Sequence, residues 1–176
     1  MACSGSKIPE DADPETPLWR FACRFWESSA ARDACLGLQD RGWSVTRILC
    51  AAWLATSGNV LPGTESAQVT AWRRQVTEPL RSAKKTITKN DPGTAIVREC
   101  IARSELEAER VELALAYQAL VSNKHTGSGE ATTANLALSN LLAAAPEKTM
   151  DNETGSLLDI LTRELSTLVE GDNKPC

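Results

Sequence analysis

Three glutamates, Glu105, Glu109 and Glu112, recur at the spacing that places side chains on one face of an α-helix. Stacked carboxylates of this kind can bind a metal ion or exchange protons with a substrate. A helical di-metal site also needs a second carboxylate-bearing helix and Glu-x-x-His pairs, and the chain has a single histidine, His125. We therefore predict no metal site and no cofactor, and we expect these glutamates to pair with cations.

A basic stretch precedes the glutamates. Six cations and a single glutamate lie between residues 72 and 89. Arg74, Arg81 and Lys85 are spaced by seven and four residues, so they form a candidate basic face that could hold phosphate groups or an acidic partner. The alternative is internal pairing, because a short turn would make this helix an antiparallel neighbour of the glutamate-bearing one.

Two polar residues, Gln39 and Asp40, end a predicted helix. Such side chains either satisfy free backbone groups at the helix end or line the mouth of a pocket, and the sequence leaves both alternatives open. We also expect an ion pair between Arg81 and Glu105 or Glu109. Together these residues form a candidate pocket or buried polar network, which consists of Gln39, Asp40, Arg81, Glu105 and Glu109.

Five tryptophans are many for a chain with one tyrosine and two phenylalanines. At helical spacing such residues usually belong to the core, but tryptophans left at an edge can anchor an interface. Trp26 and Trp43 are the candidate interface aromatics.

Cysteine and histidine usage argues against nucleophilic catalysis. The six cysteines include no CxxC pair and match no zinc spacing, so we interpret them as structural thiols. No convincing Ser-His-Asp or Cys-His arrangement can be built around one histidine. No catalytic residue is predicted, and whether the protein is an enzyme stays open, with a non-enzymatic role favoured.

The elements that position these side chains are all predicted to be helices, because apolar residues recur at helical spacing and no segment alternates for long enough to form a strand. Pro79 interrupts one helix, where we expect a kink or two helices that meet. Ile96, Val97 and Cys100 are among the residues expected to be buried in the longest helix. The predicted helices cover about residues 17–28, 30–40, 45–57, 65–88, 93–122, 130–145 and 154–170.

The fold class is therefore all-α, a compact bundle of five to seven helices with a kinked helix at Pro79 and a long helix near 93–122. The expected organisation is an N-terminal tail, a helical core, a C-terminal hairpin that is part of the core or appended to it, and a short tail, covering residues 1–15, 16–122, 123–170 and 171–176.

Composition narrows the function classes. Of 176 residues, 42% are hydrophobic and 24% charged, an ordinary globular balance. No stretch approaches the roughly 20 apolar residues of a membrane-spanning helix, and the N-terminus lacks the apolar segment of a secretory signal, so we expect a cytoplasmic protein that does not bind membranes. The net charge of −4 argues against nonspecific nucleic-acid binding by the whole surface.

Four segments occur in order between Leu18 and about Tyr117. The first is Trp19-Arg20-Phe21 with Phe25, and the second is Cys35-Leu36-Gly37-Leu38-Gln39-Asp40 with Gly42 and the helix of Val45, Leu49 and Trp53. The third consists of Trp72, Val76 and Pro79-Leu80-Arg81, and the fourth is Glu105-Leu106-Glu107-Ala108-Glu109. In this order they resemble an uncharacterised family of small proteobacterial proteins known only as a domain of unknown function. The resemblance implies a compact helical fold and a proteobacterial source, and it implies no activity.

Three hypotheses of function follow from the sequence. The first is a non-enzymatic helical adaptor that binds a protein partner, or itself, through its tryptophan-bearing or basic face. The second is a small-molecule-binding protein or enzyme with a pocket between helices. The third is nucleic-acid binding through the basic helix at 72–89.

Overall fold

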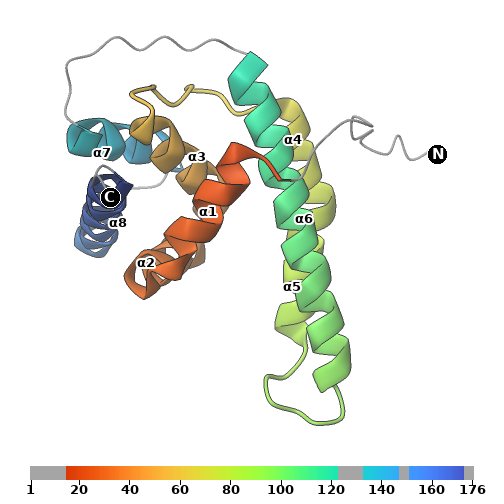
Figure 1. Ribbon diagram of the computed structural model, residues 1–176. Helices are drawn as coiled ribbons and strands as arrows, with labels where there is room; N and C mark the ends of the chain where they lie inside the picture. The colour runs from red at the N-terminus through yellow and green to blue at the C-terminus, as the bar shows by residue number, and fades with distance from the viewer. Residues whose placement is uncertain (1–14, 123–132, 147–150, 173–176) are drawn as a thin grey trace.

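The computed structural model describes residues 15–122, 133–146 and 151–172, and all regular structure in these ranges is helical (Figure 1). The all-α prediction is confirmed. The expected terminal tails lie almost entirely outside the described residues. The elements are α1 (Pro17–Glu27), α2 (Ser29–Asp40), α3 (Val45–Thr56), α4 (Ala67–Trp72), the π-helical turn η1 (Arg73–Thr77), α5 (Glu78–Thr86), α6 (Ala95–Ser122), α7 (Thr133–Ala143) and α8 (Asn152–Asp172).

The first three helices begin at hydroxyl side chains that cap them. The Oγ1 of Thr16 accepts a hydrogen bond from the Trp19 N–H at 3.0 Å, and Ser28 and Ser44 cap α2 and α3 in the same way. Each cap satisfies a backbone donor that has no partner within its helix. Gly42 follows α2 with a φ of +89°, a conformation that glycine adopts without steric cost.

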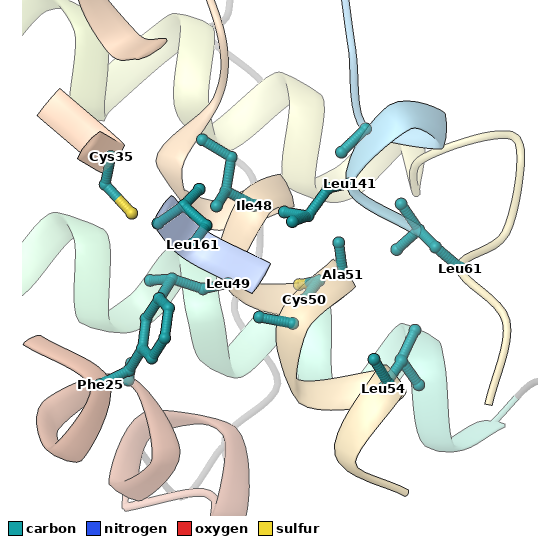
Figure 2. Packing of buried hydrophobic residues seen from close by; sticks show 14 of the residues in the cluster. Phe25, Cys35, Ile48, Leu49, Cys50, Ala51, Leu54, Leu61, Leu141 and Leu161 are labelled. Atoms are coloured by element: carbon teal, nitrogen blue, oxygen red, sulfur yellow. The ribbon is translucent and has the colours of Figure 1, made fainter. Parts of the chain in front are cut away.

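The core is organised around α3, which contacts α1, α2, α6, α7 and α8. Ile48 of α3 is fully buried among apolar side chains from the other helices. Figure 2 shows Phe25 of α1, Cys35 of α2, Leu141 of α7 and Leu161 of α8 in this cluster. The C-terminal helices therefore supply part of the apolar core.

One buried polar side chain connects α7 to the segment that follows α3. Asn140 accepts a hydrogen bond from the Leu61 N–H at 2.9 Å and donates to the carbonyl oxygens of Ala51 and Asn59 at 3.2 and 2.9 Å. Because the side chain is fully buried, these bonds replace the water that its amide group would otherwise bind.

The helix expected over residues 65–88 is interrupted just before Pro79, and the interruption is the π turn η1. Pro79 lies in the first turn of α5, where it has no N–H to donate and its ring would crowd the carbonyl four residues earlier. The chain relieves this by widening the preceding turn, so that the Glu78 N–H donates to the Arg73 carbonyl oxygen five residues back.

Helix α5 and the N-terminal half of α6 form a two-helix arm that extends beyond α1 and α2 (Figure 1). No residue of α5, all of which is described, is buried. Ile96 and Val97 are 77% and 53% exposed and Cys100 is also exposed. The prediction that these three are buried is wrong, because within the described part of the chain this face of α6 has no helix packed on it.

No helix in the described part of the chain has both the length and the apolar character needed to cross a membrane.

Candidate functional site

A cavity of about 600 Å³ opens where α1, the turn between α2 and α3, and the start of α3 face η1, α5 and α6. Its volume falls within the range of about 300 to 1,000 Å³ that is typical of sites for small organic molecules. The larger apolar side chains of its wall are Trp19, Trp26, Trp43, Leu49, Leu106 and Leu113. The charged side chains of its wall are Glu27, Arg73, Glu78, Arg81, Glu109 and Glu112.

The first charged group of the wall is built around Arg73. Its Nε donates to Oε1 of Glu112 at 2.7 Å, and its Nη1 and Nη2 donate to the two carboxylate oxygens of Glu65 at 2.6 and 2.7 Å. The Oγ1 of Thr77 donates to the other oxygen of Glu112 at 2.8 Å. Glu112, which is only 1% exposed, therefore has both carboxylate oxygens hydrogen-bonded, as a buried charge requires.

The π turn explains why Arg73 faces the cavity. A π turn holds one more residue than the α-helical turn that it replaces. Around the helix axis, Arg73 therefore points in nearly the same direction as Arg81. In an uninterrupted α-helix, Arg74 would have that position instead. Both Arg73 and Arg81 then lie against the glutamate face of α6, while Arg74 is exposed.

The second charged group is built around Arg81. Its Nε donates to Oε1 of Glu105 at 3.1 Å and its Nη2 to Oε1 of Glu109 at 2.7 Å. Lys84 also forms an ion pair with Glu105. With the Gln39 amide oriented to complete the network, its oxygen accepts from Nη1 and Nη2 of Arg81 at 3.2 and 3.3 Å. The network thus joins the end of α2 to α5 and α6.

The carboxyl of Glu109 has a pKa above its ordinary value. Burial is the largest cause, and the neighbouring carboxylates of Glu105 and Glu112 add to it, while the hydrogen bond and charge of Arg81 oppose it. The three glutamates repel one another because they share one helical face. Burial alone would lower the pKa of the Arg73 guanidinium, but Glu65 and Glu112 raise it above its ordinary value.

Three tryptophans line the cavity. The guanidinium carbon of Arg110 lies 5.3 Å from the centroid of the Trp19 ring, a cation–π distance. Trp26 is half-buried, and Trp43 is 5% exposed. The prediction of Trp43 as an aromatic anchor at an exposed interface is therefore wrong: its ring belongs to the core cluster and to the cavity wall.

The structure brings together four residues of the candidate polar network, Gln39, Arg81, Glu105 and Glu109. The fifth, Asp40, is exposed and lies outside it.

The candidate basic face does not form as one surface. Arg81 is directed to Glu105 and Glu109, whereas Arg74 and Lys85 are exposed and form no ion pair within the described residues. The prediction assumed regular α-helical geometry across residues 74–85, and the π turn changes that geometry.

Sequence reasoning missed several charged residues of the wall, above all Arg73, Glu78 and Glu27. A usable signal was present for Arg73. Arg73, Thr77 and Arg81 are spaced by four residues each, just before and after Pro79, and a proline inside a helix is a known cause of a local change in turn. Glu27 and Glu78 carry no such signal, because a single exposed glutamate is common on any helix.

Metal-ligating groups and reactive thiols are two further kinds of chemistry that side chains of this chain could carry. Among the described residues, no group of three or more histidine, cysteine, aspartate and glutamate side chains is placed to hold a metal ion. Burial raises the pKa of the Cys35 and Cys50 thiols to about 12. Cys23, in the cavity wall, also has a raised pKa, mainly from its partial burial and then from the charge of Glu15. High thiol pKa values disfavour the reactive thiolate.

Comparison with known proteins bears on the same segment of the chain. The model of a family described as a protein of unknown function, DUF2390, matches residues 17–115. The chain belongs to this family. Every residue that lines the cavity lies within the DUF2390 segment, whereas α7 and α8 lie outside it. No curated protein matches the chain, and no solved structure matches it either. The family match brings no activity with it.

Proposed function

We propose that this DUF2390 protein binds a small organic molecule in the cavity between α1, α3, η1, α5 and α6. The observation that carries the proposal is the combination of a volume of about 600 Å³ with a wall of tryptophans and hydrogen-bonded charges. An apolar wall with a few ordered polar groups is the usual character of a ligand site. The expected cytoplasmic, proteobacterial setting remains part of this proposal.

The ion pairs support binding rather than catalysis. Arg73 and Arg81 each hold two carboxylates, so their side chains are oriented before any ligand arrives. Such preorganisation reduces the ordering cost of binding. The same pairing removes the main support for nucleic-acid binding, because Arg81 does not face outward.

The experiment is a ligand-observed NMR screen of small aromatic and aliphatic fragments. Leu106 lines the cavity and is 51% exposed, so Leu106→Trp should fill its mouth without disturbing the core. Leu142→Trp is the matched control, since Leu142 is 45% exposed on α7, away from the cavity. We expect fragments that bind the native protein and the control to lose binding to the Leu106→Trp variant. A fragment set that binds all three proteins equally contradicts the proposal.

A second candidate function, self-association through the arm of α5 and α6, is favoured by the exposed Ile96 and Val97. Two-helix arms that expose apolar side chains can pair into a four-helix bundle. Sedimentation velocity of the native protein and of an Ile96→Glu/Val97→Glu variant tests it. A dimer that dissociates in the variant supports this candidate, and a native monomer at high concentration rules it out.

A further inference from the structure

The wall of the cavity has an excess of negative charge. Two guanidinium groups and four carboxylates line it, so its formal charge is −2 when all are ionised. The two arginines are not available as anion sites, because Arg73 is held by Glu65 and Glu112, and Arg81 by Glu105 and Glu109. An anionic ligand would have to displace a carboxylate from its cation, at the cost of leaving that carboxylate uncompensated.

Two of the four carboxylates account for the excess. Glu27, in the last turn of α1, and Glu78, at the start of α5, both line the cavity and are exposed. Neither forms an ion pair within the described residues. They belong to different helices of the wall, α1 and α5, so a positively charged group in the cavity would be attracted by carboxylates from two sides of the chain's fold.

Helix ends do not reverse this charge. The N-terminus of α3 lies in the wall, and it carries a partial positive charge of about half a unit. The C-terminal end of α1, at Trp26 and Glu27, lies in the wall as well and carries a partial negative charge of similar size. The two contributions offset each other, and the formal charges decide the sign.

The tryptophans suit the same kind of ligand. A cation over the face of an indole ring is attracted by the ring's quadrupole, and tryptophan is the strongest aromatic partner. Trp19 already interacts with a cation of this chain, the guanidinium of Arg110. Trp26 and Trp43 also line the cavity. Trp26 lies in the last turn of α1, and Trp43 lies two residues before α3 begins.

We propose that the cavity takes a small organic cation, an amine or quaternary ammonium carried on an apolar or aromatic body, with Glu27 and Glu78 as the residues that select its charge. This inference rests on the proposed function, because it names the ligand class of the same cavity.

The experiment compares three probes of nearly the same shape: tryptamine, which is a cation at neutral pH, tryptophol, which is neutral, and indole-3-acetate, which is an anion. Their dissociation constants are measured by NMR titration at low salt. We expect tryptamine to bind about tenfold more tightly than tryptophol, and indole-3-acetate to bind most weakly. The advantage of tryptamine should shrink as salt is added, because salt screens partly exposed charges.

Two double variants test whether Glu27 and Glu78 cause the preference for tryptamine. Glu27→Gln/Glu78→Gln removes two charges from the wall, and Glu99→Gln/Glu107→Gln removes two from exposed positions of α6 that do not line the cavity. Both have the same net charge, so a general electrostatic effect would be equal in the two. We expect the first variant to lose most of the preference for tryptamine while it binds tryptophol as before, and the second to keep that preference.

The outcomes separate this inference from the proposed function. If tryptophol or indole-3-acetate binds the native protein in the cavity as well as tryptamine does, the cavity is a ligand site and the cation inference is wrong. If the preference for tryptamine survives in Glu27→Gln/Glu78→Gln, the assignment to these glutamates is wrong. If none of the three probes binds and the fragment screen is also negative, the proposed function itself fails.

Discussion

Arg73 links two carboxylates from distant parts of the chain, Glu65 in the segment before α4 and Glu112 in the middle of α6. The side chain of Arg73 is 15% exposed and that of Glu112 is 1% exposed, so both charges are largely removed from water. A buried ion pair of this kind adds little stability compared with apolar residues of the same size. Replacing only one residue of the pair is costly, because the charge that stays buried then has no partner.

We therefore expect Arg73→Leu to lower the free energy of unfolding by about 3 to 5 kcal/mol, measured by urea denaturation. Arg74→Leu is the matched control: the neighbouring residue is exposed and forms no ion pair within the described residues, so its effect should stay within about 0.5 kcal/mol. Adding Glu112→Gln to Arg73→Leu should restore part of the loss, because it removes the uncompensated charge. Equal effects of Arg73→Leu and Arg74→Leu would contradict the assignment.

Glu109 should make stability depend on pH. Its raised pKa means that the folded protein binds this proton more tightly than the unfolded chain does. Its protonation therefore stabilises the fold, and this contribution is lost as pH rises from the ordinary glutamate pKa through the raised one. Glu109→Gln keeps the side chain uncharged at every pH.

The free energy of unfolding of Glu109→Gln, relative to the native protein, should therefore increase as the pH rises above the ordinary glutamate pKa of about 4. Urea denaturation at a series of pH values measures it. Glu107→Gln is the control, since that glutamate is exposed on the same helix. A difference between Glu109→Gln and the native protein that does not change with pH would show that the carboxyl titrates normally.

At the residue scale, the sequence predicts which residues form ion pairs better than it predicts which residues share one face of a helix. The ion pairs of Arg81 with Glu105 and Glu109 are present, because opposite charges on adjacent antiparallel helices meet over a range of geometries. Arg73 was missed because its direction depends on the π turn. A change of one residue in a turn rotates every side chain before it relative to those after it, and apolar periodicity alone does not locate such a turn.

Element boundaries follow from local chemistry and were predictable. Thr16, Ser28 and Ser44 cap their helices, and capping depends only on residues within one turn. The burial of a side chain, in contrast, depends on elements that are distant in the sequence. Ile96 and Val97 have helical spacing, but the spacing does not tell whether another element covers that face.

At the scale of the elements, Asn140 is expected to hold α7 against the segment after α3. Asn140→Leu would leave the Leu61 N–H and the Asn59 carbonyl oxygen without their partner, and would remove the side-chain bond to the Ala51 carbonyl oxygen. Each buried group left unsatisfied costs about 1 to 3 kcal/mol, so we expect a loss of at least about 2 kcal/mol in the free energy of unfolding.

The measurement is again urea denaturation, with Ser139→Ala as control because Ser139 is exposed on the same helix. Hydrogen exchange of the Leu61 amide gives a second readout. That amide should be protected in the native protein and in Ser139→Ala, and it should exchange faster in Asn140→Leu. Unchanged protection in Asn140→Leu would contradict the proposed role.

On the scale of the whole molecule, the DUF2390 segment and the C-terminal helices share one core. The family match ends at residue 115, yet α7 packs on α3 and α8 packs on α2. The hydroxyl of Ser28, which caps α2, donates to Oε2 of Glu164 in α8 at 2.7 Å. We propose that the C-terminal helices fold as part of the core rather than as an appendage, the alternative that the sequence left open.

The positions of the tryptophans allow a direct test. All five lie between residues 19 and 72, within the DUF2390 segment, so tryptophan fluorescence reports the unfolding of that segment alone. Leu161 of α8 is 1% exposed in the shared core. Leu161→Ala should lower the free energy of unfolding by about 2 to 5 kcal/mol, and the fluorescence midpoint in urea should fall with it, although α8 contains no tryptophan. Leu142→Ala, at a 45% exposed position of α7, should change the midpoint little. If Leu161→Ala alters helicity measured by circular dichroism but leaves the fluorescence midpoint in place, α8 unfolds separately and the DUF2390 segment is stable without it.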